Sequence, residues 1–176
     1  MRVFGFAGWS GSGKTTVIEQ VIPRLVERGL RVSLIKHAHH QFDVDRPGKD
    51  SWRHRHAGCT EVLVTSDLRW ALMHELRGRP ELSLAQSLAR LSPCDLAIIE
   101  GYKSAPIPKM EIWRPALGKP PLHPADAAIL AIATDAPGSL GPSIGRLAVL
   151  PMDDYAAIAT FVVDYAAVRP GLIDPA

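Results

Sequence analysis

A glycine-rich loop with a lysine and a threonine at its end lies near the start of the chain. Residues Gly8 to Thr15, "GWSGSGKT", match the phosphate-binding pattern G-x-x-x-x-G-K-[ST]. Glycines let consecutive backbone N–H groups point at a phosphate, Lys14 can reach the terminal phosphates, and the Thr15 hydroxyl can bind Mg²⁺. A glycine-rich turn that merely caps a helix is the competing interpretation. We predict nucleotide contacts from Gly8, Ser10, Gly11, Ser12, Gly13, Lys14, Thr15 and Thr16.

Glu100 is the last residue of the apolar run "LAIIE". An acid at the carboxyl end of a core parallel strand can hold a water molecule bound to Mg²⁺ or orient a nucleophile. Glu100 could instead cap a loop or pair with Lys103. Because ligands of open α/β sheets gather at such strand ends, we predict Glu100 as a catalytic residue and as a Mg²⁺ ligand beside Thr15.

A polar segment, "KHAHHQFDVDRPGKDS", runs from Lys36 to Ser51 after the second expected strand. Asp45 or Asp50 could supply an additional ligand for Mg²⁺ or water, and the cations of the segment could receive phosphate or another anion. Three histidines near its start could suggest zinc, but no HExxH or cysteine spacing supports such a site. The competing interpretation is a solvated polar loop.

Asp135 follows Thr134 at the end of a late apolar run, "AIATDAP". A carboxylate there could accept hydrogen bonds from N1–H and the exocyclic amine of guanine, whereas adenine offers no such donor pair. The motif is short and lacks the lysine of the usual guanine-reading signature. An ordinary aspartate between a strand and a loop is therefore an equal alternative.

The elements that must position these residues alternate between strands and helices. The first run, the loop and the helical pattern that ends at Gly29 form a strand–loop–helix unit, and "RVSLIKH" is the next strand. Such units cross over right-handed and form parallel sheets. Further strands are expected in "TEVLVTS", "RWALMHE", "CDLAIIEG", "KMEIWRP", "AILAIATDA" and "RLAVLP", and further helices from Asp50 or Ser51 to about Gly58, over 82–91 and in "DDYAAIATFVVDYAAV".

These patterns predict an α/β fold with a three-layer, mainly parallel sheet like that of P-loop NTPases. "TEVLVTS" and "RWALMHE" are separated by two residues, which is hairpin spacing, so the fold is expected to have an added antiparallel hairpin region. We predict one nucleotide-binding domain over residues 1–176, in which 59–74 and 104–124 form peripheral strands and loops.

Composition narrows the class of protein. A formal net charge of +2 is too small for a dedicated nucleic-acid or polybasic membrane binder. Cys59 and Cys94 have no CxxC neighbour and are expected to be buried, reduced thiols. The first residues read as a strand rather than as a signal peptide, and no segment has the length and apolarity of a membrane span. We therefore expect a cytoplasmic protein.

Several motifs, taken together and in order, resemble the family of bacterial molybdopterin-guanine dinucleotide biosynthesis adapter proteins, MobB. The segment beginning at Lys36 is far more specific for this family than the phosphate-binding loop is. The resemblance covers most of the chain and is carried by "WSGSGKTT", "LIKHAHH", "FDVDRPGKDS", "RWALM", "LAIIEGYK" and "AIATD".

The resemblance implies a GTP-binding protein, at best a slow GTPase, that assists the guanylyltransferase joining GMP to molybdopterin. It places the phosphate site on Gly11 to Thr16, the acidic site on Asp50 and Glu100, and the guanine contact on Asp135. Mg²⁺ is the implied metal, with Thr15, Asp50 and Glu100 as its ligands, and the molybdopterin cofactor is a further candidate ligand. Some members have alanine at the first position of the loop, and the presence of Gly8 there in this chain is expected to be harmless.

Two other classes of function stay open. A small-molecule P-loop kinase would use Asp45 or Asp50 as the base toward an acceptor hydroxyl. It would need an arginine-rich lid, for which residues 103–124 carry few basic side chains. A scaffold that binds nucleotide without hydrolysing it is the other alternative.

The expected hairpin also predicts a homodimer. Its apolar side chains and unpaired strand edges, with those of "KMEIWRP", would favour pairing with a second copy of the chain. In the alternative arrangement, the helix over 82–91 covers these strands within one chain and leaves a monomer.

Overall fold

The computed structural model describes residues 1–38, 42–141, 144–145 and 147–167. They fall into two compact units, which are described separately. The core unit comprises residues 1–37 and those from Leu84 onward, and the hairpin unit comprises Ala38–Ser83. The hairpin unit is inserted in the sequence between β2 (Val32–Lys36) and α3 (Leu84–Leu88) of the core unit. The prediction of a single domain over residues 1–176 stays a prediction.

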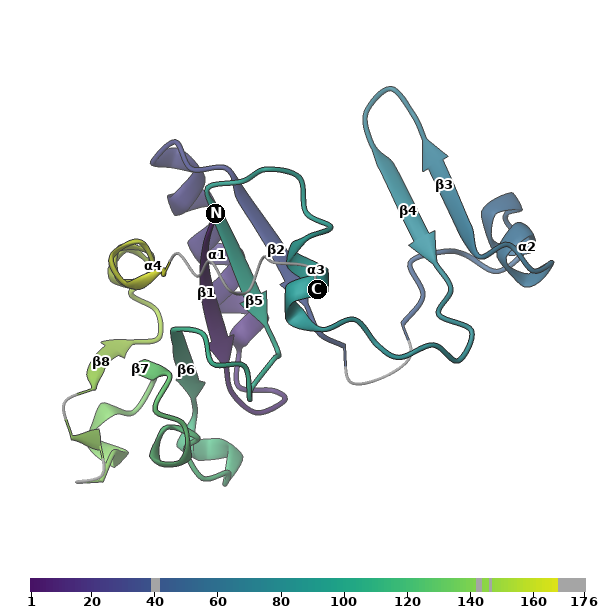
Figure 1. The fold of residues 1–176 in the computed structure, drawn as a ribbon. Helices are drawn as coiled ribbons and strands as arrows, with labels where there is room; N and C mark the ends of the chain where they lie inside the picture. The colour runs from purple at the N-terminus through teal and green to yellow at the C-terminus, as the bar shows by residue number, and fades with distance from the viewer. Residues whose placement is uncertain (39–41, 142–143, 146, 168–176) are drawn as a thin grey trace. The chain divides into compact units, whose positions relative to one another are not determined.

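The core unit is built on a six-stranded sheet in the order β2-β5-β1-β6-β7-β8, and every pair of neighbouring strands in it is parallel (Figure 1). Its strands are β1 (Arg2–Ala7), β2 (Val32–Lys36), β5 (Leu96–Glu100), β6 (Lys109–Trp113), β7 (Ile129–Thr134) and β8 (Ala148–Pro151). Its helices are α1 (Lys14–Glu27), α3 (Leu84–Leu88) and α4 (Tyr155–Tyr165), with short 3₁₀ helices η1 (Pro115–Leu117), η2 (His123–Ala125) and η3 (Pro137–Ser139).

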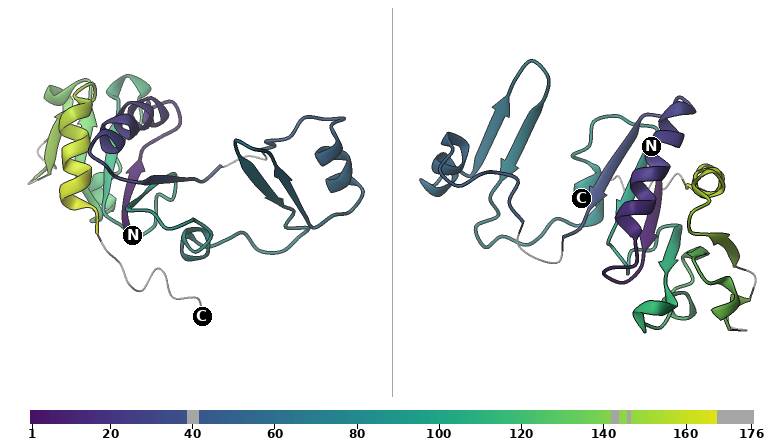
Figure 2. Two further views of the ribbon diagram at one scale, coloured as in Figure 1. Left: turned by 90° about the horizontal axis from the view of Figure 1, so that it is seen from above. Right: turned by 180° about the vertical axis from the view of Figure 1, so that it is seen from behind.

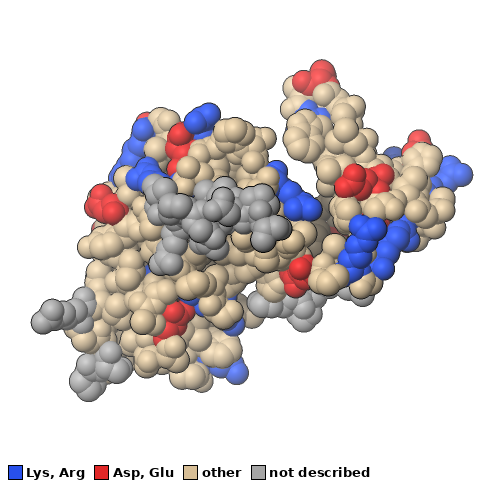
Figure 3. All heavy atoms as spheres, viewed as in Figure 1, with Lys and Arg blue, Asp and Glu red and all other residues tan. Residues whose placement is uncertain are grey.

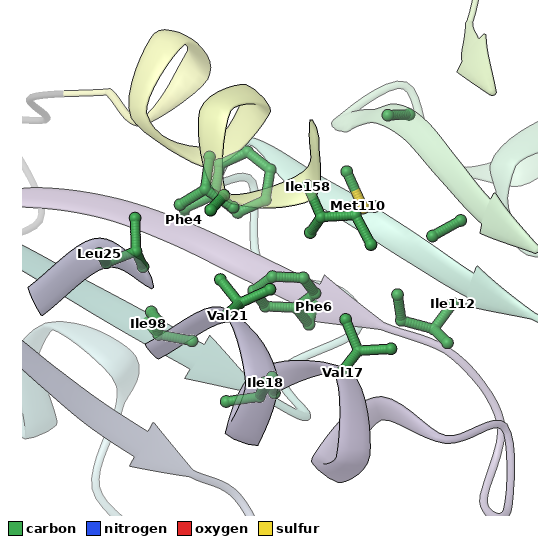
Figure 4. Packing of buried hydrophobic residues seen from close by; sticks show 14 of the residues in the cluster. Phe4, Phe6, Val17, Ile18, Val21, Leu25, Ile98, Met110, Ile112 and Ile158 are labelled. Carbon is green, nitrogen blue, oxygen red and sulfur yellow. The ribbon is translucent and has the colours of Figure 1, made fainter. Parts of the chain in front are cut away.

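Helices cover both faces of this sheet, so the core unit has three layers. Alternate strand residues point to opposite faces: Phe4 and Phe6 of β1 pack against α1 and α4, while Val3 packs in a second cluster with Leu88 of α3. Figure 4 shows side chains of α1 and α4 converging on the first face, and Figure 2 shows the two helices from two further directions. The predicted three-layer, mainly parallel α/β fold is confirmed.

The register of the strands aligns their carboxyl ends. Glu100 of β5 lies opposite Lys36 of β2 and opposite Phe6 of β1, one residue before the end of β1. Thr134 of β7 lies opposite Trp113 of β6. The loops that follow these strands therefore begin at one edge of the sheet, where ligands of such folds bind.

The hairpin unit contains α2 (Asp50–His56), β3 (Glu61–Thr65) and β4 (Trp70–His74). β3 and β4 form a two-stranded antiparallel sheet with Leu63 opposite Leu72, as the spacing predicted. Arg55 of α2 is the centre of its ion pairs. The guanidinium donates to Asp43 at 2.8 Å, to Asp45 at 3.3 Å and to Glu75 at 2.6 Å, and so joins three segments of the unit.

The prediction that "KMEIWRP" is peripheral is wrong. β6 lies between β1 and β7, and all five of its residues are buried. The prolines around it misled the sequence argument, because they stand outside the strand, where they remove no ladder hydrogen bond. Its charged residues have partners: Lys109 donates to Asp126 at 2.7 Å, and Glu111 accepts from the backbone N–H groups of Leu122 and His123.

The helix expected over 82–91 is shorter than predicted. α3 ends at Leu88, after which the N–H groups of Arg90 and Leu91 donate to residues three positions back rather than four. Ser92 precedes Pro93 and is thereby biased away from helical backbone angles, so the helix could not extend past this point. Leu84 and Leu88 pack on the core sheet with Val3. Among the described residues, no helix combines the length and apolarity needed to cross a membrane.

Candidate nucleotide-binding site

The loop between β1 and α1 has the backbone that its glycines predict. Gly8, Gly11 and Gly13 all have positive φ, and Gly13 precedes the first residue of α1 in a left-handed conformation. The predicted contact residues Ser10, Gly11, Thr15 and Thr16 are exposed, Gly13 and Lys14 are partly buried, and Gly8 and Ser12 are buried. A loop that opens the N-terminus of a fourteen-residue helix offers backbone donors and a positive dipole end to an anion.

Gly8 tolerates no side chain here. A Cβ at this position would lie 2.4 Å from the carbonyl oxygen of Ile112, and its φ of +148° disfavours any L-residue. Glycine rather than alanine therefore fits this position in this chain. β6 runs beside the start of the loop, and its backbone fills the space that a methyl group would need.

Lys14 is the first residue of α1 and is half-buried. Its ammonium donates to the carbonyl oxygens of Gly8 at 3.0 Å and Trp9 at 2.8 Å, which holds it inside the loop. Burial lowers the pKa of Lys14, and the Glu100 carboxylate opposes that shift. A charged donor held in a polar loop suits contact with phosphate oxygens.

Thr15 and Glu100 meet, as the predicted metal site requires. The Thr15 hydroxyl donates to Glu100 Oε1 at 3.0 Å, and Glu100 is 6% exposed. The Lys36 ammonium lies 3.5 Å from Thr15 Oγ1 and 3.5 Å from Glu100 Oε2, so these two oxygens already share a cation. A hydroxyl and a carboxylate at this distance fit two ligand positions of Mg²⁺, which prefers oxygen ligands and keeps several waters.

Asp135 lies on the other side of the loop, directly after β7. It borders a cavity of about 350 Å³ lined by Arg114, Thr134, Asp135, Pro137, Pro151, Met152, Asp153 and Tyr155. Arg114 Nε lies 3.6 Å from Asp135 Oδ2 and donates to Met152 Sδ at 3.2 Å. The cavity is at the lower end of the usual size for a small-ligand site. It contains polar groups beside the apolar rings of two prolines.

Asp50 belongs to the hairpin unit, so the structure describes it apart from Thr15 and Glu100. Its side chain is 88% exposed and lies 3.8 Å from Arg53. Asp43 and Asp45 are held by Arg55, and the hydrogen bond from Arg55 lowers the pKa of Asp43. Of the three aspartates in this segment, Asp50 is the one whose carboxylate stays most accessible.

His37 of the histidine-rich stretch is described, but His39 and His40 lie outside the described residues. Within the described part of the chain, no group of three or more His, Cys, Asp or Glu side chains is arranged to hold a metal ion. Cys59 and Cys94 are free thiols, as expected; Cys94 is buried as predicted, whereas Cys59 is exposed.

The sequence did not indicate that the segment after β6 contacts the phosphate-binding loop. The segment from Arg114 to Leu122 follows β6, and Trp9 Nε1 donates to the Pro120 carbonyl at 2.8 Å. The Lys103 ammonium lies 4.4 Å from the centre of the Trp9 ring. Trp9 stands at a variable position of the motif, so its type carried no signal. A basic residue directly after a core strand was a usable signal for Arg114.

Comparison with known proteins identifies the family. The family model described as "Molybdopterin guanine dinucleotide synthesis protein B" matches residues 3–135. The chain belongs to the MobB family. The "Molybdopterin-guanine dinucleotide biosynthesis adapter protein" of Escherichia coli (strain K12) is 41% identical over 166 residues, which cover 93% of this chain and 92% of that relative.

Two further MobB relatives agree with this assignment. The protein of the same name from Haemophilus influenzae is 46% identical over 136 residues, or 77% of this chain and 75% of its own length. A solved structure titled "Crystal Structure of molybdopterin-guanine biosynthesis protein B (mobB)" superposes with a TM-score of 0.68 at 26% identity, covering 92% of this chain and 98% of that one.

Proposed function

We propose that this chain is an adapter in molybdopterin-guanine dinucleotide biosynthesis, which binds GTP with Mg²⁺ and assists a guanylyltransferase. Membership of the MobB family carries the biosynthetic role. The observation that carries nucleotide binding is the phosphate-binding loop, with Lys14 held inside it and Thr15 bonded to Glu100. In this proposal the protein works in the cytoplasm.

In this proposal Asp135 selects guanine by accepting from N1–H and the exocyclic amine. ATP would leave the carboxylate facing a base edge without matching donors, and an unpaired polar group costs about 1–3 kcal/mol. We therefore expect GTP to bind at least about ten-fold more tightly than ATP. Competition titration on the wild type and on Asp135→Asn tests this, because the variant should lose most of the preference.

Glu100 and Thr15 supply two oxygen ligands of Mg²⁺ in the proposed site, and Asp50 is proposed as a third from the hairpin unit. Glu100 also orients the water that attacks GTP. Replacing Glu100 by Gln should weaken the Mg²⁺ dependence of GTP binding and abolish residual hydrolysis. The same measurement on Asp50→Asn decides whether the hairpin unit contributes a ligand.

The rate of GTP turnover distinguishes the proposed adapter from a small-molecule kinase and from a scaffold that does not hydrolyse GTP. P-loop GTPases without a supplied arginine finger hydrolyse GTP at about 10⁻⁴ to 10⁻² per second. We expect a rate in that range for the chain alone, and stimulation of guanylyl transfer when the partner transferase is added. A rate above about one per second, or transfer to a small acceptor, would favour the kinase class. GTP binding with no turnover and no stimulation would favour a scaffold.

The proposed partners are the guanylyltransferase, a second copy of this chain and the molybdopterin cofactor. Nucleic acid is not among them. Figure 3 shows Lys and Arg as well as Asp and Glu side chains on the face that it draws, and the formal net charge of only +2 does not favour a polyanion as partner. Pull-down of the transferase with and without GTP tests whether nucleotide controls the partnership.

A further inference from the structure

We propose that Arg114 binds the phosphate nearest the ribose and that loading GTP exchanges its partner from Asp135 to that phosphate. This inference rests on the proposed function, since it assumes that GTP binds between the loop and Asp135. It assigns a phosphate-binding cation that is not part of the phosphate-binding motif and that lies on the side of the loop toward Asp135.

The position of Arg114 along the sheet carries the proposal. β1, which leads into the loop, has β5 with Glu100 on one side and β6 followed by Arg114 on the other. Asp135 comes one strand further on, after β7. A nucleotide with its metal at Glu100 and its base at Asp135 must pass the end of β6, where Arg114 begins the next segment.

The guanidinium of Arg114 lies against the backbone of the loop. The point that a Cβ at Gly13 would occupy is 3.5 Å from Arg114 Nη2 and 3.6 Å from Nε, which places the guanidinium next to this residue of the loop. Gly13 directly precedes α1, whose N-terminal N–H groups are the phosphate donors. A planar, permanently charged fork at this point suits a phosphate oxygen better than an ammonium would.

The interaction of Arg114 with Asp135 is weak enough to be replaced by an interaction with phosphate. Its closest contact with Asp135 is 3.6 Å, and the two side chains are 43% and 44% exposed. Exposed ion pairs of this kind contribute little, so replacing the contact by a phosphate is favourable. When guanine takes the lone pairs of Asp135, Arg114 is released toward the phosphate without leaving a buried charge unpaired.

The test compares GTP, GDP and inosine triphosphate on three variants of the full chain. Arg114→Met keeps an apolar stem against Met152 and removes the charge, Arg114→Lys keeps a charge without the fork, and Arg31→Ala is the matched control. Arg31 forms an exposed pair with Asp95 at the opposite edge of the sheet. Affinities are measured by calorimetry, and thermal unfolding checks that each variant is folded.

We expect Arg114→Met to weaken GTP and GDP by the same factor, at least about ten-fold. The ratio of GTP to inosine triphosphate affinity should stay at its wild-type value, because inosine lacks the exocyclic amine that Asp135 reads. Arg114→Lys should recover part of the loss, and Arg31→Ala should bind like the wild type.

Three results would overturn the assignment. Unchanged GTP affinity in Arg114→Met would remove Arg114 from the site. A loss for GTP but not for GDP would place it at the terminal phosphate. A collapse of the discrimination against inosine triphosphate would mean that Arg114 acts through Asp135 or the base. Failure of the wild-type chain to bind GTP would instead reject the proposed function itself.

Discussion

Lys14 is anchored within its own loop, so the residue that should contact phosphate is positioned by the protein rather than by the ligand. Its two carbonyl partners, Gly8 and Trp9, belong to the loop it completes. Lys14 is half-buried at the start of α1. Its replacement therefore removes both a ligand contact and two bonds that shape the loop.

We expect Lys14→Ala to lower GTP affinity by about ten-fold to a thousand-fold, because one or two charge-assisted bonds at about 1.5–3 kcal/mol each are lost. Calorimetry measures the loss. The exposed Arg28 at the other end of α1 provides the control, since Arg28→Ala should leave affinity unchanged. Wild-type affinity in Lys14→Ala would refute the phosphate role.

Comparing alanine substitutions at Gly8 and Gly29 distinguishes the cost of backbone strain from the cost of a steric clash. Both have positive φ, but a Cβ at Gly29 meets nothing within 4 Å, whereas one at Gly8 meets the Ile112 carbonyl at 2.4 Å. Alanine at Gly29 should cost about 1 kcal/mol of unfolding free energy, and alanine at Gly8 about 2 kcal/mol or more. Urea unfolding measures both. Equal costs would show that the loop shifts freely away from β6.

Among the elements, the segment over the phosphate-binding loop depends on one buried carboxylate. Glu111 of β6 is 0% exposed and accepts from Leu122 N at 2.6 Å and His123 N at 3.0 Å. These bonds return the chain to the sheet after it has passed Trp9. Glu111 is thus the anchor for the segment that starts at Arg114.

Glu111→Gln should destabilise the fold by about 1–3 kcal/mol, because the amide nitrogen would face a backbone donor and leave it unpaired. Chemical denaturation gives this cost, and hydrogen exchange over 114–123 should accelerate. Glu27→Gln, at the exposed end of α1, is the control. Slow exchange in that segment, with wild-type stability, would mean that Glu111 is not its anchor.

Arg55 organises the hairpin unit, because it bonds Asp43, Asp45 and Glu75 at once. Its side chain is 10% exposed, while Arg53 on the same helix is 71% exposed. Arg55→Met should therefore accelerate hydrogen exchange and proteolysis within 43–77, and Arg53→Met should not. Equal protection in the two variants would contradict this role.

The same cluster predicts a dependence on pH. Because Arg55 holds the pKa of Asp43 below its ordinary value, the contribution of this pair is complete above the ordinary carboxyl pKa. It is lost as the pH falls through the lowered pKa of the folded state. The protection of amides in the hairpin unit against hydrogen exchange, taken relative to the intrinsic rate at each pH, should accordingly fall below about pH 4, and this fall should be absent in Arg55→Met.

At the scale of the whole molecule, the hairpin is the proposed contact with a second copy. Leu63 lies opposite Leu72, and Thr65 lies opposite Trp70, so these side chains share one face of the two-stranded sheet. Leu63, Leu72 and Trp70 are 58%, 49% and 65% exposed. A two-stranded sheet with an uncovered apolar face and free edges favours symmetric pairing. β6, which is buried, is no longer part of this surface.

Trp70→Asp or Leu72→Asp should convert a dimer into a monomer while GTP affinity is retained. Sedimentation at micromolar concentration distinguishes the mass of two chains from that of one. Val26→Asp is a matched control, since Val26 is 53% exposed on α1, outside the hairpin unit. A wild-type mass of one chain would reject the dimer, and a dimer that survives both substitutions would move the interface elsewhere.

The sequence by itself determined the features that depend on neighbours along the chain. The loop from Gly8 to Thr15, the helix that follows it and the hairpin spacing of β3 and β4 are local patterns, because glycine backbone freedom and side-chain period act over a few residues. The meeting of Thr15 with Glu100 also followed, since parallel strands place their carboxyl ends at one edge.

Only the tertiary structure decided which strand lies where and which charges are already paired. The central place of β6, the contact of Arg114 with Gly13 and the capture of Asp43 and Asp45 by Arg55 depend on how distant segments meet. The prolines near β6 do not reveal that the strand is central. The sequence around Asp43, Asp45 and Asp50 does not show which of these aspartates are paired with Arg55. Strand order and buried ion pairs are set by packing free energy summed over the fold, which no short stretch of sequence contains.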